Sequence, residues 1–128
     1  MTRSVITTDL APAAIGSYAQ GVRAGNLIFT SGQIPIDPVT QQVVAGGIAE
    51  QTTRVMENLK AVLEEAGSSL DRVIKSTVFL KDLSDFSAMN AVYADYLEFD
   101  GEAPARTTVE VSRLPRNVLV EIELVAEA

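Results

Sequence analysis

Hydrophobic side chains recur at three- and four-residue spacing over residues 48–66, which predicts an amphipathic helix that ends at Gly67. A second helix is expected downstream, with Asp82 or Ser84 as its N-terminal cap. The apolar stripe of the first helix comprises Ile48, Thr52, Val55, Met56, Leu59, Val62, Leu63 and Ala66. The stripe of the second comprises Phe86, Met89, Tyr93 and Leu97.

Other segments are rich in β-branched and aromatic residues and predict strands. These strands are residues 26–34, preceded by a short segment 22–25, then 72–81, 106–112 and 117–125, the last two joined by a turn at Leu114-Pro115. The order is β-β-α-β-α-β-β. It predicts one α+β domain over residues 1–128, in which a mixed sheet has both helices packed on one face.

The predicted strands have apolar residues on both faces. In the segment 72–81, Ile74, Val78 and Leu80 are expected to point one way, and Val73 and Phe79 the other. Two helices cover only one face of a sheet, so we expect the second face to pack against another subunit. The alternative is a monomer with a few exposed apolar residues, which is common.

Composition narrows the chemistry. The chain has no histidine and no cysteine, which excludes serine–histidine triads, cysteine nucleophiles, disulfides and ordinary zinc sites. Its formal net charge is −7 and its ten Lys and Arg residues are scattered, so no nucleic-acid partner is expected. There is no segment of signal-peptide or membrane-spanning character, and a cytoplasmic location is expected.

Strand alternation points to one candidate site. Arg106, Thr108 and Glu110 share one face of their strand, and Glu121 and Glu123 share a face of the last strand. If these strands are neighbours, an arginine and a carboxylate meet on the face expected to contact another subunit. The arginine would bind a substrate carboxylate, and the glutamate would hold water or pass a proton. A surface salt bridge is the alternative.

The motifs along the chain resemble those of the Rid family of imine and enamine deaminases, the YjgF-type proteins, over almost the whole sequence. The matching segments are AAIGSYAQG (13–21), FTSGQIP (29–35), residues 51–67 with ENLK, KSTVFLKD (75–82), PAR (104–106), VEV (109–111), the Leu114-Pro115 pair and VEIE (120–123). Two positions depart from the family pattern. Thr108 stands where many relatives have cysteine, and Ser17 replaces a common proline.

The resemblance implies a chorismate-mutase-like subunit in a homotrimer, with active sites between subunits. It implies hydrolysis of 2-aminoacrylate and related 2-imino acids to 2-oxo acids and ammonia, without metal or organic cofactor. Arg106 would bind the substrate carboxylate and Glu121 would orient water or shuttle protons. The other pocket residues implied by the matching motifs are Tyr18, Ser31, Gly32, Asn90 and Thr108.

Two other functions fit the same sequence. A regulatory trimer would bind a 2-oxo acid through Arg106 and catalyse nothing; retention of Glu121 favours catalysis, because simple carboxylate binding does not require it. Ribonuclease or translation-inhibitor activity has been attributed to some relatives. The net charge of −7 and the missing histidines argue against it.

Overall fold

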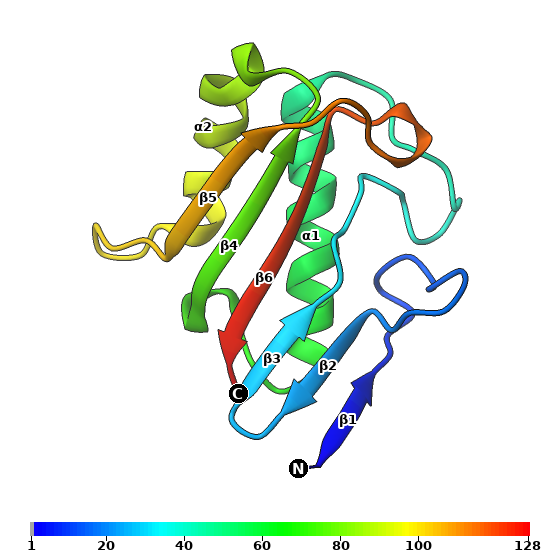
Figure 1. Cartoon of the computed structure of the whole chain (residues 1–128), viewed down its shortest axis with the longest axis vertical. Helices are drawn as coiled ribbons and strands as arrows, with labels where there is room; N and C mark the ends of the chain where they lie inside the picture. Colours follow the sequence, from blue (N-terminus) through cyan, green and yellow to red (C-terminus); the bar gives the residue numbers. More distant parts are fainter. Residues whose placement is uncertain (1) are drawn as a thin grey trace.

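Six strands form one mixed sheet in the computed structural model, which describes residues 2–128 (Figure 1). Across the sheet their order is β1-β2-β3-β6-β4-β5. The strands are β1 (Arg3–Ile6), β2 (Gly21–Ala24), β3 (Leu27–Thr30), β4 (Val73–Leu80), β5 (Ala105–Glu110) and β6 (Val120–Glu127). Every neighbouring pair is antiparallel except β4 and β5, which are parallel and are joined by a helical crossover.

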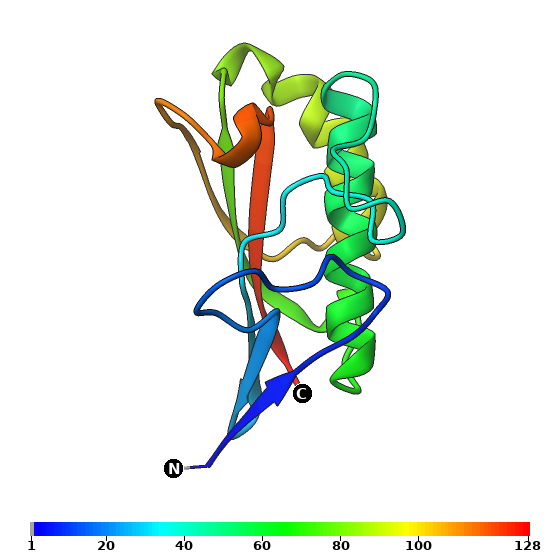
Figure 2. The same ribbon diagram turned by 90° about the vertical axis from the view of Figure 1, so that its right-hand side faces the viewer.

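Two helices, α1 (Ile48–Glu65) and α2 (Phe86–Leu97), lie side by side on one face of the sheet (Figure 2). Both helices were predicted with nearly these bounds. Asp82 accepts a hydrogen bond from the backbone of Ser84, at the start of the short 3-10 turn Leu83–Asp85 that leads into α2. Further 3-10 turns lie at Leu70–Arg72 and Pro115–Asn117. No helix within residues 2–128 is long and apolar enough to cross a bilayer.

The core lies between the helices and the sheet. α1 and β6 supply most of its fully buried side chains, so the apolar stripe predicted for α1 is confirmed. The core comprises, among others, Ile28, Val55, Met56, Leu59, Val62, Leu63, Val78, Leu80, Met89, Leu97, Val120, Ile122 and Leu124. The predicted α+β architecture with both helices on one face is therefore confirmed.

Three details of the strands differ from expectation. β1 was not predicted; its four residues are mostly exposed, and it pairs only with β2 among the described strands. The segment predicted as a strand over 26–34 is a strand only over Leu27–Thr30. In β4 a register shift between Val73 and Lys75 turns Val73 into the core and leaves Ile74 42% exposed, which reverses the faces predicted for both.

The other face of the sheet is not covered by a helix (Figure 2). Phe29 and Val109 on this face are 44% and 37% exposed, and the half-buried Phe79 lies on the same face. Glu121 and Glu123 of β6 alternate with the core residues and therefore also point to the open face. A second subunit on this face stays a prediction.

Candidate functional site

Arg106 is a residue of β5 whose side chain contacts α2. It is opposite Ser76 of β4, on the face that the helices cover. Its Nη1 donates a hydrogen bond to Asn90 Oδ1 of α2 over 2.6 Å. Its guanidinium carbon lies 4.7 Å from the ring centroid of Tyr93 and 5.2 Å from that of Phe86. The Tyr93 hydroxyl in turn shares a 2.6 Å hydrogen bond with Ser76, so the ring is fixed under the cation.

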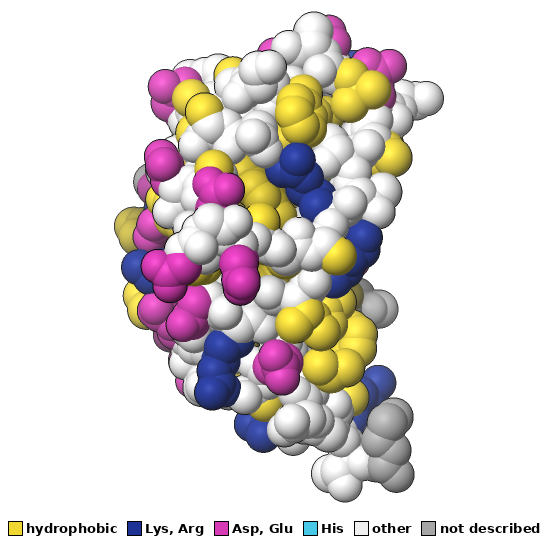
Figure 3. Space-filling view, turned by 90° about the vertical axis from the view of Figure 1, so that its left-hand side faces the viewer, with side chains coloured by type: hydrophobic (Ala, Val, Ile, Leu, Met, Phe, Trp, Pro, Cys, Tyr) yellow, Lys and Arg dark blue, Asp and Glu magenta, His cyan; other side chains and the backbone are white. Residues whose placement is uncertain are grey.

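These contacts orient the guanidinium without neutralising it, because an amide oxygen and two aromatic rings carry no net charge. Within residues 2–128 the side chain of Arg106 makes one hydrogen bond, the one to Asn90. The other N–H groups of the fork are free to bind the two oxygens of a carboxylate. A view of the α2–β5 side shows a hollow floored by hydrophobic side chains and bordered by basic and acidic ones (Figure 3).

Thr108 provides a second polar group beside this cation. It follows Arg106 by two residues on β5 and therefore shares its face. Its hydroxyl is buried and has no hydrogen-bond partner in the described part of the chain. A buried hydroxyl without a partner is costly, and a ligand oxygen at this place would satisfy it. We call Arg106, Asn90 and Thr108 the arginine group.

Glu121 lies on β6 and packs its carboxylate against the backbone of Gly32. A β-carbon added at Gly32 would lie 2.1 Å from Oε2 of Glu121, so a larger residue at this position would require the carboxylate to move. The next residue, Gln33, exchanges two backbone hydrogen bonds with Ile122, of 2.9 and 3.2 Å, which holds this loop beside β6. The close approach of Gly32 and Glu121 is thus built into the pairing of the two segments.

Ser31 holds the two residues that follow Tyr18, Ala19 and Gln20, close to Gly32. Its backbone N–H donates to the carbonyl of Gln20 over 3.0 Å, and its hydroxyl donates to the carbonyl of Ala19 over 2.5 Å. The segment that follows Tyr18 therefore runs alongside Ser31 and Gly32, and Tyr18 itself is 52% exposed. The four residues Tyr18, Ser31, Gly32 and Glu121 form what we call the glutamate group.

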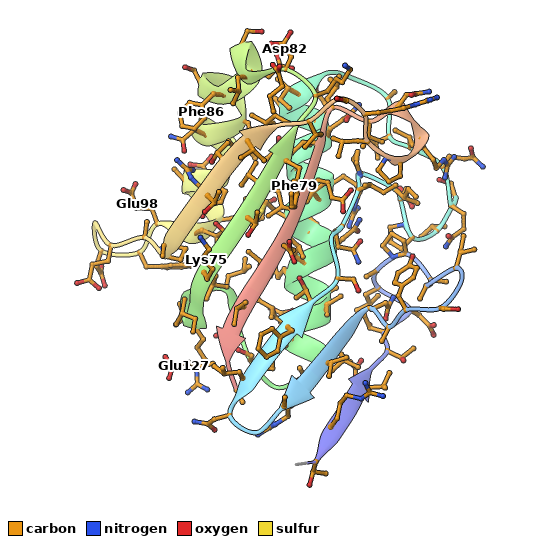
Figure 4. The ribbon with its side chains drawn as sticks, viewed as in Figure 1. Lys75, Phe79, Asp82, Phe86, Glu98 and Glu127 are labelled. Atoms are coloured by element: carbon orange, nitrogen blue, oxygen red, sulfur yellow. The ribbon has the colours of Figure 1, made fainter. Side chains whose placement is uncertain are left out.

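The two groups lie on opposite faces of the sheet, so the expectation that Arg106 and Glu121 meet on one face of neighbouring strands is wrong for a single chain. β4 lies between β5 and β6. On one side of β4, Arg106 pairs with Ser76, which is fully buried under the helices. On its other side, Glu121 pairs with Phe79, which lies on the open face. Figure 4 labels a residue of each side, Phe86 on α2 and Phe79 on the sheet.

Burial raises the pKa of the Glu121 carboxyl above its ordinary value of 4.5, and the negative charge of Glu123 raises it further. Glu123 is the next residue on the same face of β6. A carboxyl with a raised pKa exchanges protons closer to neutral pH than an ordinary glutamate does. Glu121 is therefore suited to accept a proton from water and to return it.

The raised pKa of Glu121 leads to a prediction about the thermal stability of the protein. Because the folded chain holds the Glu121 proton more tightly than the unfolded chain, the ionised side chain destabilises the fold as pH rises from the ordinary glutamate pKa through the raised one. Glu121→Gln is therefore expected to have a higher Tm than wild type at pH 7, and a Tm closer to wild type at pH 3.5. Thermal unfolding at both pH values tests this; an equal difference in Tm at both would contradict it.

Comparison with known proteins decides the family. The family model described as endoribonuclease L-PSP matches residues 8–128. The chain is 57% identical over 126 residues to a RutC family protein of Pyrococcus abyssi, with 98% of each chain covered. It belongs to the Rid family. This Rid protein is also 50% identical over 122 residues to an Escherichia coli protein named 2-iminobutanoate/2-iminopropanoate deaminase, with 94% of each covered.

Its fold agrees with that of solved Rid structures. It matches the crystal structure of YyfA from Yersinia pestis, described as a Rid-family protein of unknown function, with a TM-score of 0.96. The two sequences are 44% identical, and the match covers 99% of this chain and 100% of the other. The predicted fold family is therefore confirmed, while the roles predicted for individual residues stay predictions.

Sequence reasoning missed the two aromatic rings that hold Arg106 in this Rid protein. Phe86 and Tyr93 were assigned only to the apolar stripe of the second helix. Asn90 follows Phe86 by four residues and precedes Tyr93 by three, so the three side chains share one face of α2. An amide between two aromatic residues at helical spacing was the available signal.

Proposed function

We propose that this Rid protein hydrolyses 2-aminoacrylate and related 2-imino acids to 2-oxo acids and ammonia in the cytoplasm, as a 2-iminobutanoate/2-iminopropanoate deaminase. The environment of Arg106 is the observation that supports this most. An oriented guanidinium, on the same face of β5 as a buried hydroxyl that has no hydrogen-bond partner within residues 2–128, fits a substrate carboxylate. The name of the 50% identical Escherichia coli relative supports the reaction.

The arrangement of the two groups supports a site formed with a second subunit. One small substrate cannot contact both faces of a sheet, so Arg106 of one copy would face Glu121 of another. The apolar residues of the open face would be buried in the same contact. We infer a homotrimer, as the family resemblance implies, with each site formed by the arginine group of one subunit and the glutamate group of its neighbour.

The reaction needs binding, a positioned water and proton transfer. Arg106 and the hydroxyl of Thr108 would hold the carboxylate of R–C(=NH)–COO⁻. As the water oxygen bonds to the imine carbon, the Glu121 carboxylate would take its proton and pass one to nitrogen, giving a carbinolamine. Glu121 would then take the hydroxyl proton and deliver it to the amino nitrogen as the C–N bond breaks, which forms the 2-oxo acid, releases ammonia and returns Glu121 to its carboxylate form.

An enamine such as 2-aminoacrylate enters this sequence one step earlier. Its terminal carbon gains a proton while its nitrogen loses one, and the product is the 2-imino acid. The protonated form of Glu121, which its raised pKa favours, would supply the proton to carbon. The same side chain would then serve the hydrolysis as a carboxylate.

The test is a competition for the imine. An amino-acid oxidase or a serine/threonine dehydratase would generate 2-iminobutanoate or 2-iminopropanoate in the presence of semicarbazide, which traps it. Wild-type protein is expected to suppress trapping, and Arg106→Ala is not. If neither protein affects trapping, the deaminase proposal fails, and binding of 2-oxobutanoate without turnover would indicate the carboxylate-binding regulator instead.

Ribonuclease activity has less support from this molecule. The description of the family model names an endoribonuclease. However, the formal net charge is −7, and the basic side chains on the α2–β5 side are few and separate among acidic ones (Figure 3). Titration with single-stranded RNA at 50 and 150 mM salt is expected to detect no binding.

The close approach of Gly32 to the Glu121 carboxylate leads to a prediction about activity. Gly32→Ala would place a methyl group where the Glu121 carboxylate lies, so the carboxylate must move. We expect imine hydrolysis to fall about 10²-fold, because a misplacement of about 1 Å can cost this much. Gly47→Ala is the matched control. Its added β-carbon would meet nothing closer than 3.9 Å, and it should retain activity. Equal activity of both variants would contradict the assignment.

A further inference from the structure

One buried amide organises the long loop between β1 and β2. Gln20 is 3% exposed, and its Nε2 donates to the carbonyls of Thr8, Ala11 and Pro12 over 3.0, 3.2 and 2.8 Å. Its Oε1 accepts the backbone N–H of Thr8 over 2.7 Å. A single side chain thus satisfies four backbone groups of residues 8–12, which have no regular secondary structure to satisfy them.

Gln20 also belongs to the segment that Ser31 holds. The backbone carbonyl of Gln20 accepts from the Ser31 N–H, and the Ala19 carbonyl accepts from the Ser31 hydroxyl. The side chain of Gln20 therefore joins residues 8–12 to a backbone that is itself fixed beside Gly32 and Glu121. Tyr18 lies in the sequence between residues 8–12, which the Gln20 side chain binds, and the Ala19–Gln20 backbone, which Ser31 binds. Its side chain is half exposed.

Within residues 2–128, Gln20 is the one buried polar side chain that connects residues 8–12 to the segment beside Ser31. Without its amide, this connection would be lost. Tyr18 has few other constraints, since Gly16 before it adopts φ +102 and the residues from 13 to 18 are all exposed. The path of the segment that carries Tyr18 thus depends on Gln20.

We propose that Gln20 is a positioning residue for imine hydrolysis, acting by holding the 8–20 loop so that Tyr18 lies at the glutamate group. This inference rests on the proposed function. It makes Gln20 act through Tyr18 and through no contact of its own with substrate.

A double-mutant cycle tests it. Gln20→Met keeps the size of the side chain and removes all four hydrogen bonds, and Tyr18→Ala removes the side chain that Gln20 is said to place. In the wild-type background, Gln20→Met is expected to lower kcat/KM for 2-iminobutanoate about tenfold. In the Tyr18→Ala background the same change is expected to lower it less than about twofold, since residues that act as a unit are not additive.

A second variant and a control complete the test. Gln20→Glu, which keeps the acceptor for Thr8 N–H but lacks the donors, runs through the same cycle and is expected to show the same coupling. Ser68→Ala removes a different buried hydrogen bond, to the Glu127 carbonyl, and should lower Tm without changing kcat/KM.

The outcomes separate this inference from the proposed function. Equal losses in both backgrounds, or full activity of Tyr18→Ala alone, overturn the positioning role while leaving imine hydrolysis intact. Absence of turnover by wild-type protein overturns both. A loss confined to the background that contains Tyr18 supports the inference.

Discussion

Replacement of Arg106 by alanine is expected to lower kcat/KM for 2-iminobutanoate about a thousandfold, mainly through KM. The guanidinium would make two parallel hydrogen bonds to the substrate carboxylate. Hydrogen bonds to charged groups are worth about 1.5–3 kcal/mol each, and about 1.4 kcal/mol corresponds to a factor of ten. Steady-state kinetics with imine generated in situ would measure the loss.

Arg106→Lys separates charge from geometry. Lysine keeps the positive charge but cannot present two parallel donors or stack its plane on Tyr93 and Phe86, so a loss of about 10- to 100-fold is expected. The control is Arg23→Ala, because Arg23 is exposed on β2 and its side chain donates only to the nearby Gly25 carbonyl in the described chain. A loss for Arg23→Ala similar to that for Arg106→Ala would contradict a specific role of Arg106.

Replacement of Glu121 by glutamine is expected to lower kcat about 10²- to 10⁴-fold, the usual contribution of a positioned general acid or base. Glutamine has nearly the same shape and should still fit against Gly32, so binding of 2-oxobutanoate is expected to survive. Kinetics together with calorimetric titration of 2-oxobutanoate would separate turnover from binding. Unchanged kcat would contradict the assignment of proton transfer to Glu121.

Glu123→Gln is the matched control for this carboxylate. Glu123 lies on the same face of β6 and its charge contributes to the raised pKa of Glu121. Its removal should leave the maximal kcat within about threefold of wild type, and should lower the pKa of Glu121. If hydrolysis requires the Glu121 carboxylate, the rise of kcat with pH shifts to lower pH in this variant. A shift to higher pH would contradict that cause.

The helices and the layer architecture could be predicted from the sequence because they follow from the spacing of apolar residues along each element. The apolar stripe from Ile48 to Leu63 allows one orientation of α1, and Gly67 ends it. In β6, Glu121 and Glu123 alternate with Val120 and Ile122, so its inward face was also clear. Local periodicity contains this information because burial depends on which side of an element a residue occupies.

Strand order and the face of Arg106 were harder to predict because they depend on contacts distant in sequence. The unit β4–α2–β5 favours a parallel pair, which places β5 beside β4, and this inference was available. Insertion of β6 between β3 and β4 has no local signal. The face of β5 that carries Arg106, Thr108 and Glu110 is entirely polar, so nothing in the local pattern showed that Arg106 points to α2.

Formation of one site by two subunits is the central claim, and mixed oligomers test it most directly. Arg106→Ala and Glu121→Gln chains would be unfolded, mixed in equal amounts and refolded together, alongside each variant alone and wild type. In randomly assembled rings about one site in four pairs an intact Arg106 with an intact Glu121 from the neighbouring subunit. The mixture is therefore expected to recover about a quarter of wild-type imine hydrolysis, although each variant alone is nearly inactive. A mixture as inactive as its components would contradict the claim.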